Sequence, residues 1–97
     1  MGKTALSLAA QQGHLQALRP LVKTRIGVNS ADFISMTPLH WAVVGGHSDC
    51  VQELLRHDAD ADIPNAGLGN TPLILAVDCG HLDIVRLLIS ANCNVNA

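Results

Sequence analysis

The segment Thr37–His47, TPLHWAVVGGH, and the residues just after it contain side chains that could bind a metal ion. His40, His47 and Cys50 offer imidazole and thiolate groups, which are common zinc ligands. Their spacing is looser than in the usual zinc motifs, where the ligands come in closely spaced pairs. A metal-binding or catalytic domain that uses these three residues is therefore the alternative interpretation of this chain, beside a structural role for them.

The same region also holds the residue types of a nucleophilic catalytic triad. His47, Ser48 and Asp49 are consecutive in the sequence. A nucleophile and its base must converge in space, however, and adjacent residues rarely do so. The sequence also lacks a glycine-rich phosphate loop that follows a strand. We therefore predict that the protein is not an enzyme, and the sequence points to no cofactor.

Composition and charge narrow the class of protein further. The 97 residues, 48% of them hydrophobic, suffice for one domain with a modest core. No apolar run approaches the length of a membrane span, so we expect no membrane insertion. A net charge of -2 argues against general nucleic-acid binding, which needs many Lys and Arg side chains. Four of the six basic residues precede residue 26, and all eight acidic residues lie from Asp32 onward.

The cysteines indicate the compartment. Cys50, Cys79 and Cys93 show no Cys-x-x-Cys spacing, and three cysteines cannot all pair within one chain. This usage favours a reducing environment. The beginning of the sequence also lacks the pattern of a signal peptide. We expect an intracellular protein, cytoplasmic or nuclear.

A comparison of the sequence with itself shows which elements carry these residues. Thr4, Thr37 and Thr71 are 33 and 34 residues apart. The same offsets align further identical residues, namely Leu6, Leu39 and Leu73; Ala9, Ala42 and Ala76; Gly13, Gly46 and Gly80; and His14, His47 and His81. A period near 33 is typical of a solenoid built from repeated units.

Each unit has the pattern of two helices. In the second copy, Thr37 can cap a helix whose first turn accepts Pro38, and the Gly-Gly pair before His47 ends it. A second helix is predicted from about Ser48 to His57, with one apolar stripe. The link between the two helices is so short that they must be antiparallel. The following DADADIPNAGLGN is an extended connection with a tight turn.

These motifs together resemble the ankyrin repeat. The family pattern is Thr-Pro-Leu-His-x-Ala, then Gly-His, then an apolar helix, and TPLHWAVVGGHSDCVQELLRHDADAD matches it over a full unit. The resemblance implies an all-α fold, an ankyrin-repeat solenoid of antiparallel helix pairs with protruding β-hairpin-like turns. We expect a single domain over residues 1–97, with repeats at about 4–31, 32–65 and 66–97, which forms a segment of a longer protein.

The resemblance also assigns structural roles to the residues that could do chemistry. In this family the histidine after the glycine ties adjacent turns together through backbone groups, which implies this role for His47, His14 and His81. Cys50 aligns with aliphatic residues of the other copies and is predicted to be a small core residue. Trp41 aligns with leucines and is predicted to pack in the core.

The function implied by the resemblance is that of a protein–protein interaction module, a scaffold or adaptor. Such a module binds a protein or peptide partner through its concave face and its hairpin tips. At one tip the sequence has Phe33, Ile34 and Met36, where polar turn residues are expected. We predict that at least two of these three side chains are exposed and contact the partner. The neighbouring concave positions are Gln11, Gln12, Val44, Gly45, Leu68, Asn70, Asp78 and Cys79.

Three departures lead to further expectations. Pro20 lies inside the second helix of the first copy and should kink it or delay its start to about residue 20. The last helix, LDIVRLLIS, has more apolar residues than one face can bury, so part of it should contact a further unit, a partner or, end to end, a second copy. Asn92 stands where that helix should end, before NVNA begins another hairpin.

The family resemblance also implies a modification site. Ankyrin-like turns are substrates of an intracellular asparagine hydroxylase, which acts on the Asn of a Val-Asn pair eight residues after a Leu. Asn29 follows Leu21 and Asn96 follows Leu88 by this spacing. The alternative is that both asparagines only form hydrogen bonds within the turns.

Overall fold

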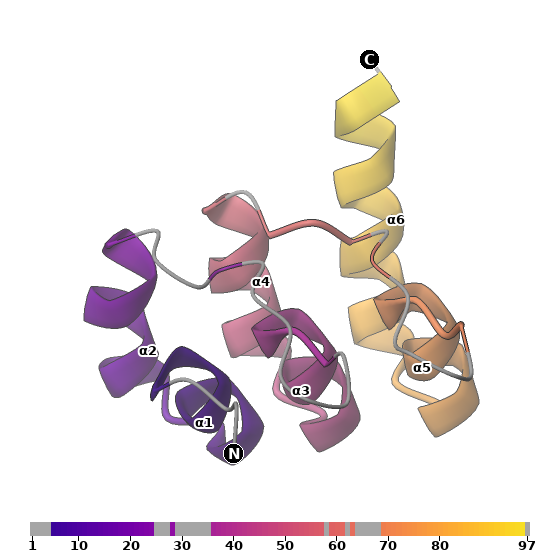
Figure 1. The fold of residues 1–97 in the computed structure, drawn as a ribbon. Helices are drawn as coiled ribbons and strands as arrows, with labels where there is room; N and C mark the ends of the chain where they lie inside the picture. The colour runs from indigo at the N-terminus through magenta and orange to yellow at the C-terminus, as the bar shows by residue number, and fades with distance from the viewer. Residues whose placement is uncertain are drawn as a thin grey trace.

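The structure is a computed structural model that describes residues 5–24, 28, 36–57, 59–61, 63 and 69–96. These residues contain six helices: α1 (Ala5–Gln12), α2 (Leu15–Lys23), α3 (Pro38–Gly45), α4 (Ser48–Arg56), α5 (Pro72–Cys79) and α6 (Leu82–Asn96). The helices form three antiparallel pairs, as Figure 1 shows. The predicted all-α repeat fold is therefore confirmed. Most of the connections in which we expected hairpin-like turns lie outside the described residues.

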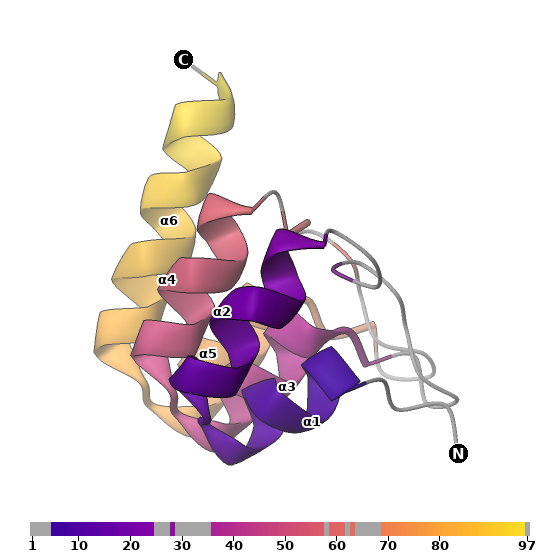
Figure 2. The same cartoon turned by 90° about the vertical axis from the view of Figure 1, so that its left-hand side faces the viewer.

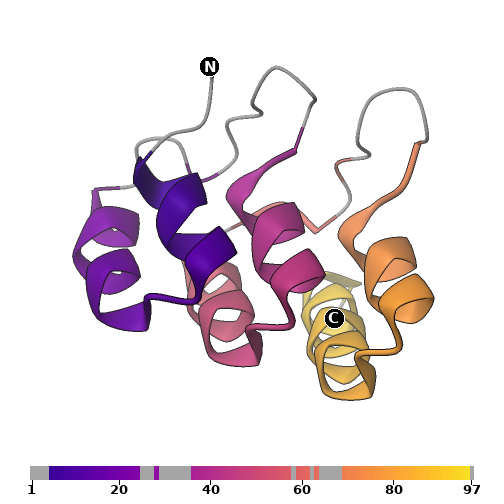
Figure 3. The same ribbon diagram turned by 90° about the horizontal axis from the view of Figure 1, so that it is seen from below.

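The three pairs stack side by side in two layers. The first helices form one layer, in which α1 packs on α3 and α3 on α5 (Figure 3). The second helices form the other, in which α2 packs on α4 and α4 on α6 (Figure 2). Each pair packs chiefly on its immediate neighbour, which is the arrangement of a solenoid.

The ends of α3 follow from local sequence signals. The Thr37 hydroxyl accepts a hydrogen bond from the backbone N–H of His40, and the Thr37 N–H donates to His40 Nδ1 at 3.0 Å, which closes a capping box. Pro38 occupies the first turn, where the lack of an N–H costs nothing. Gly46 ends the helix with φ of 73°, a left-handed conformation. These details confirm the predictions made for this helix.

The two threonine caps allow a matched test. Thr37→Ala removes a buried hydroxyl that also lies 2.7 Å from His40 Nδ1, and we expect it to lower the free energy of unfolding by about 1–2 kcal/mol. Thr71→Ala should cost less, because Thr71 is half-buried and accepts only from the Ile74 N–H, at 3.4 Å. Urea denaturation of both variants would measure the difference. Equal losses would contradict a special contribution of the capping box.

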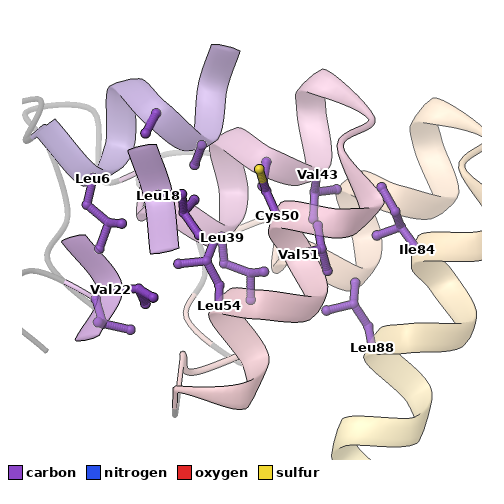
Figure 4. Packing of buried hydrophobic residues seen from close by; sticks show 14 of the residues in the cluster. Leu6, Leu18, Val22, Leu39, Val43, Cys50, Val51, Leu54, Ile84 and Leu88 are labelled. Atoms are coloured by element: carbon purple, nitrogen blue, oxygen red, sulfur yellow. The ribbon is translucent and has the colours of Figure 1, made fainter. Parts of the chain in front are cut away.

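The core lies between the layers and between neighbouring pairs (Figure 4). Its fully buried side chains come from all three pairs and include Leu18, Val22, Leu39, Val43, Cys50, Val51, Leu54, Ile84 and Leu88. The prediction that Cys50 is a core residue is confirmed. Trp41 is half-buried and packs against this cluster, as its alignment with leucines predicted.

The expected late start of α2 near Pro20 is wrong, whereas the alternative, a kink at Pro20, stays a prediction. The helix begins at Leu15 and continues through Pro20 to Lys23. The proline lacks the N–H that would bond to the Gln16 carbonyl, at a cost of about 3 kcal/mol. Leu18 and Val22, on the same helix, are fully buried, and burial contributes about 1.5–3 kcal/mol for each such side chain. Core packing therefore outweighs the lost hydrogen bond.

The expected end of the last helix is also wrong. We placed it at Asn92, with the start of another hairpin after it, but α6 continues to Asn96. No glycine or proline interrupts the sequence between Ala91 and Asn96. Asparagine has only a modest preference against helix, so these residues can continue the helix that Leu82 begins.

Candidate functional site

Two of the three histidines that follow a helix-ending glycine, His47 and His81, connect neighbouring pairs, whereas His14 is exposed. His47 Nε2 lies 3.1 Å from the Gln11 carbonyl oxygen of the preceding pair. Its ring also lies against Gly13, where an added Cβ would come within 2.5 Å of Nδ1. The ring of His81 lies in the same way on Gly46, where an added Cβ would be 2.9 Å away. The predicted structural role of His47 as a tie between turns is therefore confirmed.

The residues of the alternative metal site take part in three different arrangements. His40 is buried and belongs to the capping box with Thr37. His47 faces the Gln11 carbonyl, and the Cys50 thiol is buried in the core. Among the residues that the structure describes, no group of three or more His, Cys, Asp or Glu side chains could hold a metal ion.

Burial determines the chemistry of the Cys50 thiol. Burial, helped by the carboxylate of Asp49, raises the pKa of this thiol to about 11. Cys79, by contrast, is exposed at the end of α5. Because the thiolate is the reactive form, Cys50 should be inert in the folded protein.

We therefore expect the two thiols to differ in their labelling by iodoacetamide. Cys79 should react under native conditions near neutral pH, whereas Cys50 should react only after unfolding. Peptide mapping by mass spectrometry would locate the label. Rapid native labelling of Cys50 would contradict its burial.

The raised pKa of the Cys50 thiol also makes the stability of the protein depend on pH. Because the raised pKa favours the folded state only while the thiol stays protonated, this stabilisation is fully present below about pH 9 and is lost as the pH rises towards 11.

The predicted concave positions form two rows across the first helices. Gln11, Val44 and Asp78 occupy equivalent positions in α1, α3 and α5, and the next residues are Gln12, Gly45 and Cys79. Because α1 packs on α3 and α3 on α5, the structure brings these rows together near the ends of the helices. We call these residues the inner surface. Val44, at the centre of the inner surface, is 43% exposed. Gln11 is half-buried, and the other residues of the inner surface are exposed.

The remaining predicted positions have mixed outcomes. Phe33, Ile34 and Leu68 lie outside the described residues, so their exposure stays a prediction. Asn70 is half-buried, next to the Thr71 cap of α5. Met36 is buried, with only 7% of its surface exposed, so it is not an exposed contact residue, and the prediction that at least two of the three tip side chains are exposed depends on Phe33 and Ile34.

A local signal could have identified the burial of Met36. This residue directly precedes the Thr37 cap, and a hydrophobic residue there often packs against the fourth residue of the helix, a hydrophobic staple. In α3 the fourth residue is Trp41, which is partly buried against the core. The apolar character of the segment alone predicts a binding tip, whereas this helix-start motif predicts the burial of Met36.

The two asparagines proposed for hydroxylation have different positions. Asn29 lies outside the described residues. Asn96 is the last residue of α6, rather than part of a turn after that helix. Hydroxylation of either residue stays a prediction.

The third pair exposes more apolar surface than the first two. Leu82 and Ile89 of α6 are 70% and 48% exposed, which confirms that the last helix does not bury all its apolar residues. Ile74 and Val77 of α5 are also exposed, and this part of the surface was not predicted. None of the helices in the described part of the chain is long and apolar enough to cross a membrane.

Fold, histidine ties and sequence pattern together define the class of the protein. A family profile described as ankyrin repeats in three copies matches residues 6–97. The chain therefore belongs to the ankyrin-repeat family.

The similar proteins are much longer than this chain. The chain is 37% identical over 99 residues to neurogenic locus notch homolog protein 1 of Xenopus tropicalis, and 33% identical over 100 residues to the B-cell lymphoma 3 protein homolog of Mus musculus. Each alignment covers 99% of this chain, but only 4% and 22% of these relatives. Palmitoyltransferase Hip14 of Drosophila melanogaster is 36% identical over 83 residues, which cover 86% of this chain and 13% of that enzyme. The similarity thus concerns a repeat segment of much longer proteins.

Proposed function

We propose that this domain is a scaffold or adaptor module that binds a protein or peptide partner along the inner surface. Ankyrin repeats are in general protein-interaction modules, and the chain belongs to this family. The finer proposal, that the inner surface is the binding site, rests on the exposure of Val44. This valine is 43% exposed, although Val43, the preceding residue of the same helix, is fully buried.

The surroundings of Val44 have the composition of a small interface. Exposed Gln12 and Asp78 lie on the neighbouring helices α1 and α5, on either side of α3. An apolar centre with a polar rim is the usual organisation of protein interfaces. Gly45, beside Val44, leaves room for the His47 ring, because an added Cβ there would lie 2.6 Å from His47 Cδ2.

A displayed library of random peptides, selected on the immobilised protein, would provide a probe for this surface. We expect Val44→Arg to weaken binding of the best selected peptide by about tenfold or more, because it places a charge at the centre of the interface. Gln52→Arg is the matched control, since it adds the same side chain at an exposed position on α4, in the other layer. Isothermal titration calorimetry would compare both variants with the wild type. Equal affinity of the peptide for all three proteins would place the binding site elsewhere.

We further propose that these repeats have no catalytic role. Ankyrin-repeat domains are typically non-catalytic, and the relative that is an enzyme, palmitoyltransferase Hip14, is matched over only 13% of its length. An intracellular location is proposed with it, supported by the free thiols of Cys50 and Cys79.

A further inference from the structure

The third helix pair exposes apolar side chains at positions that are buried or half-buried in the earlier pairs. Val43 of α3 is fully buried, whereas Val77, at the same position of α5, is 63% exposed. Val22 of α2 is fully buried, whereas Ile89, its equivalent in α6, is 48% exposed. The first two pairs each have a later pair packed against them, whereas the described residues place none on the third, so these positions face the next pair of the stack in the earlier pairs. We call the corresponding open surface of the third pair the C-terminal face, made of Ile74, Val77, Gly80, Leu82 and Ile89.

The first pair shows the opposite pattern. Leu8 of α1 is 46% exposed, whereas Trp41, at the same position of α3, is half-buried against the core. Ala17 of α2 is exposed, whereas its equivalent Cys50 is fully buried. The second and third pairs each pack on a preceding pair, whereas the described residues place none on the first, so these positions face the preceding pair in the later copies. The N-terminal face consists of Leu8, His14, Ala17 and the half-buried Leu21.

The contacts inside the molecule show what fits the C-terminal face. At each internal junction the histidine of the later pair covers a glycine of the earlier one, His47 on Gly13 and His81 on Gly46. Gly80 has the same left-handed conformation, but no described atom lies within 4 Å of the place where its Cβ would be. His14, the equivalent histidine of the first pair, is exposed. The third pair thus offers a glycine, and the first pair a histidine, without their counterparts.

We propose that the C-terminal face binds the N-terminal face of a second copy of this chain. His14 of the incoming copy takes the place on Gly80 that His47 takes on Gly13, and Leu8 and Ala17 cover Val77 and Ile89. The two faces lie at opposite ends of the stack (Figure 1). The contact is therefore heterologous, and each added copy leaves one face of each kind free.

The distribution of charge supports this choice of occupant. Residues 1–31 contain four Lys or Arg residues and no acidic residue, and Arg19 and Lys23 are exposed on α2. The third pair carries Asp78 and Asp83, both exposed, against a single basic residue, Arg86. The basic end of one copy and the acidic end of another attract each other and favour the head-to-tail orientation.

Two complementary variants test the proposal. Leu8→Arg disrupts the N-terminal face and Val77→Arg disrupts the C-terminal face, and both positions are exposed, so the fold should persist. By sedimentation velocity, we expect the wild type to associate with rising concentration and each variant alone to remain a monomer. An equimolar mixture should form a dimer, because each variant retains the face that the other has lost. Val44→Arg, with its change on the inner surface, should associate like the wild type.

Gly80→Ala tests the histidine contact within this interface. A Cβ at Gly80 would meet the incoming His14 ring as a Cβ at Gly13 would meet His47, and we expect about a tenfold rise in the Kd of association. Gly69→Ala, at a left-handed glycine outside this face, should not change the Kd of association.

A wild type that stays monomeric at all concentrations would overturn the proposal, and a further segment of a longer protein would then be the better candidate occupant. A dimer formed by Leu8→Arg alone would overturn it too, since this variant could only pair through its C-terminal faces.

Discussion

Gly13→Ala is expected to destabilise the protein by about 1.5–3.5 kcal/mol, although it adds a single methyl group. Two costs combine in this variant. Gly13 has φ of 74°, and a residue with a Cβ in this conformation costs about 1–2 kcal/mol. The new Cβ would also lie 2.5 Å from His47 Nδ1, so the ring must move and lose its contact with the Gln11 carbonyl, at about 0.5–1.5 kcal/mol.

Gly80→Ala is the matched control, because Gly80 has φ of 77° and open space around its Cβ position. Measured at a dilution where the chain is monomeric, it should cost only the conformational part, about 1–2 kcal/mol. In a His47→Ala background the cost of Gly13→Ala should fall to the same value, since the ring that it displaces is gone. Urea denaturation of the wild type and of these four variants, the double variant included, gives this comparison. If both glycine variants lose equal stability in the wild-type background, the histidine tie contributes nothing.

Leu54→Ala is expected to cost about 2–5 kcal/mol, the range for a fully buried leucine that leaves a cavity. Leu54 lies in α4 of the middle pair, which packs on both α2 and α6. In a solenoid the stability is a sum of unit and interface contributions, so damage to the middle pair weakens both junctions at once. Thermal and urea denaturation followed by circular dichroism would measure the loss.

Leu82→Ala provides the control for the loss of a leucine. Leu82 is 70% exposed, and such a surface substitution should change the stability of the monomer by no more than about 0.5 kcal/mol. A similar loss in both variants would mean that Leu54 is not held in a packed core. A loss below about 1 kcal/mol for Leu54→Ala would lead to the same conclusion.

The features that could be predicted from the sequence are those encoded within a few residues or repeated in register. The Thr37 cap, Pro38 and the left-handed Gly46 each follow from local backbone chemistry. The roles of His47 and Cys50 followed from their alignment with the other copies, because equivalent positions of a repeat share one environment. The candidate residues of the inner surface were placed together for the same reason.

The predictions that failed depended on interactions beyond the local pattern. The hydrogen bond that Pro20 removes predicts a late start of α2, whereas the burial of Leu18 and Val22 determines the extent of the helix. The position of Met36 in a turn predicts exposure, whereas its burial depends on the helix that follows. The repeat pattern predicts an end of α6 at Asn92, although residues 92–96 contain no residue that stops a helix.

The stacking of each pair chiefly on its neighbour also has a mechanical meaning. The two junctions follow one another along the stack. A small rotation at one therefore adds to a small rotation at the other, while each helix pair moves as a unit. A partner that contacts the inner surface at both α1 and α5 must fix the relative orientation of the helix pairs at both junctions. Binding of such a partner would cost the repeats more conformational entropy than binding of one that rests on α3 alone, and it would stiffen the whole molecule.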